Sequence, residues 1–175
     1  MKNRDKFEMK NIDVRPATFS VLEHWWDKKI VLHPFDNAYK VWKKCFISEN
    51  ANGKRRTFFA FDDGRYVGQG TLLLYGDDEE LTRGDRAEII KLEIEEEYRN
   101  KGIATLIYKR IENHAKAVGI KYLTIGVEPC EIRNMQIYFH WGFTSFIKVD
   151  KETYPPKKVG EDGETITVLY YAKEV

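Results

Sequence analysis

The stretch that decides the fold reads Tyr98-Arg99-Asn100-Lys101-Gly102-Ile103-Ala104 and lies between a predicted strand and a predicted helix. The first amides of a helix have no partner inside the helix, and the helix dipole adds partial positive charge there. Gly102 and Ala104 leave room for a ligand beside the backbone, while Arg99 and Lys101 add positive charge. These properties suit a pyrophosphate. A tight strand-to-helix turn that happens to carry two basic residues would fit the same stretch.

The segments on both sides of this turn predict a strand, a helix and a second strand in succession. Residues 87–94 are typical of a strand, the apolar positions from Ile103 to Val118 follow helical spacing, and residues 122–127 suit a buried strand. Gly119 suits the end of the helix. Because such a unit joins its strands by a right-handed crossover, we expect the two strands to pair in parallel.

The rest of the chain predicts hairpins and further helices. A tight-turn signal at residues 62–65 separates strands at 57–61 and 66–75, which predicts an antiparallel hairpin. A capping box at Ser20 and Glu23 predicts the start of the first helix. The other expected elements are a strand at 12–15, a helix after Asp36 or Asn37, loops at 76–85 and 150–164, a helix at 131–141, and strands at 143–149 and 165–173. We therefore expect an α/β fold with a mixed, mostly antiparallel twisted sheet of about seven strands and about four flanking helices.

The composition is that of a globular protein whose charges nearly cancel. The 175 residues are 42% hydrophobic, and 29 basic residues against 28 acidic ones give a formal net charge of +1. Such a balance provides no long-range field to attract nucleic acid or an anionic membrane, so neither is an expected partner. Residues 1–6 are polar and lack the apolar run of a signal peptide. We expect one domain over residues 1–175, located in the cytoplasm.

The two cysteines do not predict a disulfide or a metal site. Cys45 and Cys130 are isolated in the sequence, and no pair of residues has metal-ligand spacing. Cys130 lies close to the expected site and invites an acyl-cysteine mechanism, but a small buried residue is the better interpretation. No metal is expected.

The turn at residues 98–104 resembles the signature of the GNAT superfamily of acyl-CoA-dependent N-acetyltransferases. That signature is Gln/Arg-x-x-Gly-x-Gly/Ala, which Arg99, Gly102 and Ala104 satisfy. Three further segments are similar to the family's third strand, its fourth strand and its Tyr-x-x-x-Gly-Phe segment, namely residues 66–70, 87–94 and 138–143. One motif alone is weak evidence, whereas several in the correct order are strong. The resemblance implies a GNAT-like fold for the whole chain.

The resemblance also implies where acetyl-CoA binds. In this family the cofactor lies in a wedge between the fourth and fifth strands. Its pantetheine arm is expected to pair with the strand backbone as an added strand, and its pyrophosphate is expected on the amides of the turn. The cofactor-binding residues implied in this way are Leu92, Glu93, Ile94, Arg99, Asn100, Lys101, Gly102, Ile103, Ala104 and Thr105.

Acetyl transfer to an amine needs a base, and the resemblance makes Glu88 the first candidate. A free alkyl amine has a pKa near 10, so a group must take its proton at neutral pH before nitrogen can attack. Glu88 occupies the fourth-strand position where several relatives keep a general base. Glu93 is a rival, and a carboxylate that only makes hydrogen bonds in the sheet would fit equally. We expect Glu88→Gln to lower turnover most at low pH.

Tyr138 sits where the family places the acid that protonates the leaving CoA thiolate. A core tyrosine on an amphipathic helix is the other interpretation of this residue. Many relatives carry an asparagine seven residues before this tyrosine, and Glu131 stands there in this sequence. Asn134 lies on the same helical face and is the candidate to replace it. A backbone amide near Leu92 is expected to polarise the thioester carbonyl.

Together these residues predict an N-acetyltransferase that moves an acetyl group from acetyl-CoA to a primary amine by direct attack in a ternary complex. The acceptor stays open: a small amine metabolite, a polyamine or an antibiotic is favoured over a peptide N-terminus. The acidic run at 77–80 favours a cationic acceptor. The alternative is a catalytically inactive module that senses acyl-CoA and docks a partner, which the missing asparagine supports. Exposed edge strands permit a homodimer.

Overall fold

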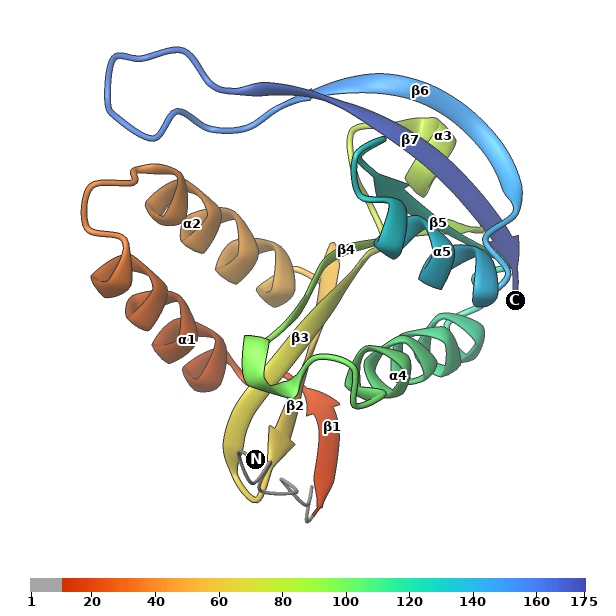
Figure 1. The fold of residues 1–175 in the computed structure, drawn as a ribbon, viewed down its shortest axis with the longest axis horizontal. Helices are drawn as coiled ribbons and strands as arrows, with labels where there is room; N and C mark the ends of the chain where they lie inside the picture. The colour runs from red at the N-terminus through yellow and green to blue at the C-terminus, as the bar shows by residue number, and fades with distance from the viewer. Residues whose placement is uncertain (1–10) are drawn as a thin grey trace, which may run out of the picture.

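Seven strands form a single sheet in residues 11–175, the part of the chain that this computed structural model describes (Figure 1). Their order across the sheet is β1-β2-β3-β4-β5-β7-β6. The strands are β1 (Ile12–Pro16), β2 (Arg55–Asp62), β3 (Arg65–Leu73), β4 (Arg86–Ile94), β5 (Tyr122–Val127), β6 (Ser145–Thr153) and β7 (Thr165–Glu174). Only β4 and β5 pair in parallel. The predicted mixed, mostly antiparallel sheet is therefore confirmed. The polar segment at residues 1–6, used above against a signal peptide, lies outside the described residues.

Helices cover both faces of this sheet. They are α1 (Phe19–Leu32), α2 (Ala38–Ala51), α3 (Glu79–Thr82), the 3-10 helix η1 (Glu96–Tyr98), α4 (Ile103–Ala117) and α5 (Ile132–His140). Figure 1 shows α1 and α2 on one side of the sheet and α4 with α5 on the other. None of the helices in residues 11–175 combines the length and the apolar character needed to cross a bilayer.

Strand alternation supplies each face of the sheet with its own core. Phe58 and Phe59 are neighbours on β2 and point to opposite faces. Phe58 packs with the fully buried Ile107 of α4, whereas Phe59 packs with Trp26 of α1 and Phe46 of α2. Burial of each such side chain contributes about 1.5–3 kcal/mol. These two cores hold β3 and β4 rigidly between the helices.

The strands β4 and β5 separate halfway along their length. Their parallel pairing runs from Arg86 opposite Tyr122 to Ile89 opposite Ile125, and the register records no pair beyond Ile89 although both strands continue. A β-bulge lies just past this point, because Lys91 and Leu92 both stand opposite one residue of β3. Lys91 has a φ of 50°, which is unusual for a residue with a side chain. The sheet therefore opens between β4 and β5.

The start of the first helix differs from the predicted capping box. The helix begins at Phe19, and its cap is Thr18, whose hydroxyl accepts a hydrogen bond from the Val21 amide at 3.4 Å. Ser20 lies inside the first turn, so its side chain cannot cap it. Thr18 has an extended backbone with ψ of 160°, which is the conformation that a cap requires. The second helix begins at Ala38, directly after Asn37, as predicted, and the Asp36 carboxylate accepts a hydrogen bond from the Ala38 amide at 3.0 Å.

Two segments predicted as loops contain regular structure. Within residues 76–85, Asp78 caps the short helix α3 and Leu81 is buried in a cluster with Val168 and Tyr170 of β7. Within residues 150–164, β6 continues to Thr153, which pairs with Thr165. Both depend on contacts with a distant strand, which local sequence does not reveal. The β6–β7 hairpin curves over the sheet toward α2 (Figure 1), where the Asn37 amide donates to the Lys157 carbonyl at 2.5 Å.

Candidate active site

A cavity of about 470 Å³ lies where β4 and β5 separate. We call it the wedge cavity. Its lining is residues 88–93 of β4, residues 125–127 of β5, Glu128, Glu131, Asn134 and Tyr138 of α5, Trp42 and Phe46 of α2, Arg55 of β2, and residues 152–155, Ile166 and Val168 of the β6–β7 hairpin. Because α5 and α2 cover opposite faces of the sheet, the wedge cavity passes through the sheet from one face to the other.

The wedge cavity brings together part of the predicted site. Glu88, Leu92, Glu93, Asn134 and Tyr138 all line it. The other predicted residues, Ile94 and residues 99–105, do not line it. They lie where β4 leads through η1 into α4. The predicted residues therefore form two groups, a reactive group at the opening of the sheet and a turn at the start of α4.

Glu88 is held in an environment that keeps its carboxyl group neutral. It is only 8% exposed, and it points to the α2 face because its neighbours Ala87 and Ile89 belong to the core beneath α4. Its carboxyl group makes no side-chain hydrogen bond within the described residues. Burial, and then the carboxylates of Glu152 and Asp78, raise the pKa of Glu88 to about 8, against the opposing charges of Arg55 and Lys148.

The raised pKa of Glu88 reverses the expected pH dependence of its replacement. At neutral pH the group is mostly protonated and cannot accept a proton from an amine. It becomes a base as the pH rises through about 8, which is near the operating range of an efficient general base. If Glu88 is the base, this pKa shifts the expected effect of Glu88→Gln from low pH to pH values above about 8.

Tyr138 faces the same cavity from the opposite side of the sheet. Its ring packs 5.8 Å from that of Trp141, which in turn stacks on Tyr108 at 4.4 Å, so α5 is fixed against α4. Burial, and then the nearby Glu131, raise the pKa of Tyr138 to about 12. The hydroxyl therefore keeps its proton throughout the neutral range. Tyr138 packs on the core and also lines the cavity, so its position fits either interpretation.

Asn134 lies beside Tyr138 and contacts the residue that it is predicted to replace. Its amide nitrogen donates to the carboxylate of Glu131 at 2.9 Å, and both residues line the wedge cavity. Asn134 is half-buried, whereas Glu131 is exposed. The pair thus places one amide and one carboxylate at the mouth of the cavity on the α5 side.

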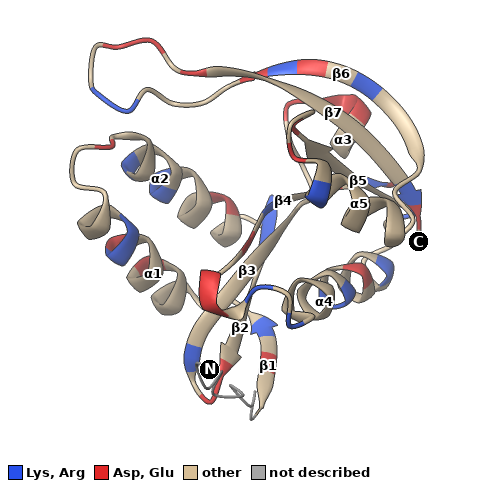
Figure 2. Ribbon diagram, in the orientation of Figure 1, with Lys and Arg blue, Asp and Glu red and all other residues tan. Residues whose placement is uncertain are grey.

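The turn before α4 presents unpaired amides, as the sequence predicts. Gly102 is the N-cap residue with φ of 80°, and the amides of Ile103, Ala104 and Thr105 donate to no backbone carbonyl within residues 11–175. Asn100 also has a positive φ, and Arg133 of α5 donates to its side-chain oxygen. Figure 2 shows the acidic η1 followed at once by the basic turn that leads into α4. Such a helix end suits an anion.

Replacing Gly102 by Ala separates backbone strain from ligand binding. We expect a loss of about 1 kcal/mol in the free energy of unfolding, because an L-residue is strained at positive φ, and a loss of about tenfold in affinity for a pyrophosphate-bearing ligand. Urea unfolding and calorimetric titration measure the two effects. Gly119→Ala is the matched control, since it has φ of 85° at the other end of α4 and equally open surroundings. An equal loss of affinity in both variants would contradict the binding role of the turn.

Several residues at the site are not predicted from the sequence. Arg133 approaches the turn from α5, and Lys91 enters the cavity because of the β4 bulge. Trp42 falls in the helix predicted after Asp36 or Asn37, and Tyr154 falls in the loop predicted at 150–164. No local signal marks any of them, because their positions depend on how distant elements meet.

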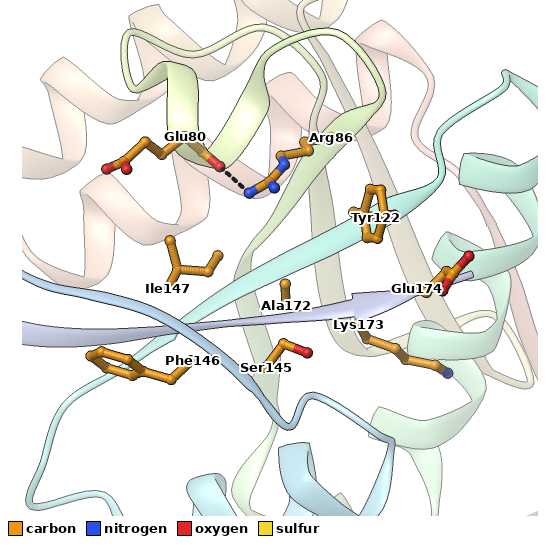
Figure 3. A pocket seen from close by; sticks show the side chains of 9 residues that line it. All are labelled: Glu80, Arg86, Tyr122, Ser145, Phe146, Ile147, Ala172, Lys173 and Glu174. Carbon is orange, nitrogen blue, oxygen red and sulfur yellow. Dashed lines mark hydrogen bonds between the residues drawn. The ribbon is translucent and has the colours of Figure 1, made fainter.

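Other reactive side chains lie outside the wedge cavity. Cys130 is exposed, so the expectation of a buried residue is wrong, and its sulfur lies 3.8 Å from the Glu128 carboxylate. His114 and His140 do not line the cavity either. A second hollow of about 390 Å³ lies at the opposite ends of β4 and β5 (Figure 3). There Arg86 donates to the Glu80 carbonyl at 3.0 Å beside Tyr122. None of the predicted site residues lines this second hollow.

Comparisons with known proteins agree with this fold. The family model described as the acetyltransferase (GNAT) family matches residues 18–143. No curated protein matches the chain.

Among solved structures, an IAA acetyltransferase from Bacillus cereus is 16% identical, covers 94% of this chain and 100% of its own, and has a TM-score of 0.64. A ribosomal-protein-alanine N-acetyltransferase from Brucella melitensis is 15% identical over 93% of this chain and 99% of its own, with a TM-score of 0.65. The yncA protein from Salmonella typhimurium, solved with its cofactor acetyl-CoA, is 12% identical over 94% of each chain, with a TM-score of 0.66. Identities this low show a common fold and nothing finer.

Proposed function

Because this chain belongs to the acetyltransferase (GNAT) family, we propose that it transfers the acetyl group of acetyl-CoA to a primary amine. One observation carries the proposal. The wedge cavity places a buried carboxyl group, Glu88, and a protonated phenol, Tyr138, on one continuous space that crosses the sheet. A base on one side and a proton donor on the other are the two groups that amine acetylation needs.

The described residues suit the pyrophosphate and the pantetheine arm of acetyl-CoA. The unpaired amides of Ile103 to Thr105 suit the pyrophosphate, with Arg99, Lys101 and Arg133 supplying charge near it. From there β4 leads back toward the cavity, and residues 90–94 have no strand beside them on the β5 side. The backbone of Leu92, Glu93 and Ile94 suits the amides of the pantetheine arm. When bound, acetyl-CoA supplies an activated thioester.

Glu88 and Tyr138 divide the proton transfers between them. Glu88 takes the proton of the acceptor ammonium, directly or through one water, so that the nitrogen lone pair becomes free to attack. Tyr138 donates a hydrogen bond to the departing thiolate. The attacking nitrogen loses its second proton, to this thiolate or to water, as the C–S bond breaks and the amide forms. An ordinary thiol has a pKa of about 8.5, below that of Tyr138, so hydrogen bonding to the developing charge is favoured over complete transfer. Attack is direct, in a ternary complex, with Asn134 positioned to orient a reactant.

The acceptor side of the cavity faces α2 and the β6–β7 hairpin. Besides Glu88, carboxylates outnumber cations in the lining, with Glu93, Glu128, Glu131 and Glu152 against Arg55 and Lys91. A small cationic amine is the acceptor that such a lining favours. We further propose that the chain acts as a single catalytic domain in the cytoplasm, where acetyl-CoA is at hand.

The test is release of free thiol from acetyl-CoA in the presence of polyamines, aminoglycosides, amino acids and short peptides, beside calorimetric binding of acetyl-CoA. We expect binding, and thiol release that depends on at least one cationic amine. Binding without any amine-dependent release would favour the alternative, an acyl-CoA-sensing module. Failure to bind acetyl-CoA would contradict both.

A further inference from the structure

The ammonium group of Lys91 rests against two aromatic rings inside the acceptor side of the wedge cavity. Its nitrogen lies 3.8 Å from the centre of the Trp42 ring and 5.7 Å from that of Tyr154. The two rings are 6.0 Å apart and nearly perpendicular, at 88°. Trp42 belongs to α2, whereas Tyr154 follows β6. Two separate elements thus meet around one cation, which is the arrangement of an aromatic cage.

Ring faces, and not a carboxylate, hold this cation. Lys91 makes no ion pair within 4.0 Å among the described residues. Burial lowers the pKa of Lys91, while the more distant carboxylates of Glu93 and Glu152 act in the opposite direction. By contrast, the other cation of the lining, Arg55, is bound to the carboxylate of Glu49. The Lys91 nitrogen therefore lies against ring faces, with no carboxylate within 4.0 Å among the described residues.

The β4 bulge places this cage on the same face of the sheet as Glu88. In a regular strand Glu88 and Lys91 would point to opposite faces, because side chains alternate. The extra residue at the bulge cancels one alternation, so both side chains turn toward α2 and line the same cavity. A proton acceptor and a cation-binding cage consequently share one chamber.

We propose that Trp42 and Tyr154 form the binding site for a second, non-reacting ammonium group of the acceptor, which displaces Lys91 from the cage. The acceptor is then a diamine or polyamine. This inference rests on the proposed acetyl transfer. The nitrogen that attacks must be neutral beside Glu88, so the cage holds a different, charged nitrogen of the same molecule. The Lys91 side chain, itself an alkylammonium, has the chemistry of the ligand that the cage accepts.

Binding of tetramethylammonium tests the cage without any acetyl transfer. The probe is a cation that cannot be acetylated, and the Trp42 indole N–H signal in two-dimensional NMR reports its arrival, assigned by its loss in Trp42→Leu. We expect Lys91→Ala to bind the probe about tenfold more tightly than the parent protein, because the competing ammonium is gone. Lys121→Ala, which removes an exposed lysine charge far from the cavity, is the matched control and should behave as the parent. Equal affinity in Lys91→Ala and the parent would overturn the proposal.

Turnover provides the second arm of the test. Each α,ω-diamine of a series of increasing length is compared with the monoamine of the same chain length. In the parent protein we expect kcat/KM for the best diamine to be about tenfold higher than for the monoamine of the same length. This preference should be larger in Lys91→Ala and absent in Trp42→Leu. Tyr154→Leu, whose site lies in a loop, serves if Trp42→Leu unfolds. Equal kcat/KM for diamines and monoamines in an active enzyme would refute the cage alone, whereas probe binding without turnover on any amine would refute the proposed function alone.

Discussion

Replacing Glu88 by Gln is expected to lower kcat/KM about a hundredfold above pH 8 and to change it little well below that pH. The reason is the pKa of Glu88, about 8, which leaves the parent protein without its base at lower pH. The ratio of parent to variant kcat/KM should therefore rise with pH and level off above about 8. Ionisation of the acceptor amine affects kcat/KM equally in both proteins, so its effect cancels in this ratio.

Two controls separate the base from other effects of the substitution. Glu93→Gln alters a carboxylate that lines the same cavity and lies 3.8 Å from Lys29. The ratio of parent to Glu93→Gln kcat/KM should not change with pH. Stability is the other control. Folding raises the pKa of Glu88. The contribution of its carboxyl group to the free energy of unfolding is therefore fully present at low pH and is lost as the pH rises toward 8. Gln resembles the protonated form, so the variant should melt no lower than the parent above pH 8. A flat ratio for Glu88→Gln would exclude Glu88 as the base.

Replacing Tyr138 by Phe is expected to lower kcat about a hundredfold while the dissociation constant of acetyl-CoA stays near that of the parent. The variant loses only the hydroxyl, and the ring keeps its contact with Trp141. Because the pKa of Tyr138 is about 12, the loss should be the same from pH 6 to pH 9. Steady-state kinetics and calorimetric titration measure the two quantities.

Tyr122→Phe is the matched control for this substitution. Tyr122 is a half-buried tyrosine at the far end of β5, outside the wedge cavity. Its replacement should leave kcat unchanged. Full activity of Tyr138→Phe would show that another group meets the leaving thiolate, and an equal loss in both variants would point to a general effect on folding.

The features that the sequence predicts correctly are those written in local patterns. Helical spacing from Ile103, the glycine before it and the alternation of the flanking strands are sufficient to predict the parallel β4–α4–β5 unit. The turn signal at residues 62–65 likewise predicts the β2–β3 hairpin. Glu88 and Tyr138 come from the family resemblance, and the structure places both in one cavity.

The features that the sequence does not predict depend on distant contacts. The short helix α3 is too brief for a periodic pattern and is stabilised by burial of Leu81 against β7. The raised pKa of Glu88 comes first from burial and then from Glu152, which belongs to the curved β6–β7 hairpin. The cage needs a bulge at Lys91 and a tyrosine from a predicted loop. Each of these features depends on contacts between elements that lie far apart in the sequence.

The most direct test of acetyl transfer follows the acetyl group itself. Acetyl-CoA labelled with carbon-13 in its carbonyl is mixed with the protein and a diamine at pH 8.5, and NMR records where the label arrives. We predict an amide signal on the acceptor that grows in step with free thiol in the parent and is almost absent in Tyr138→Phe. Label that appears only in acetate, or stays in acetyl-CoA bound to the protein with every amine supplied, would contradict an N-acetyltransferase.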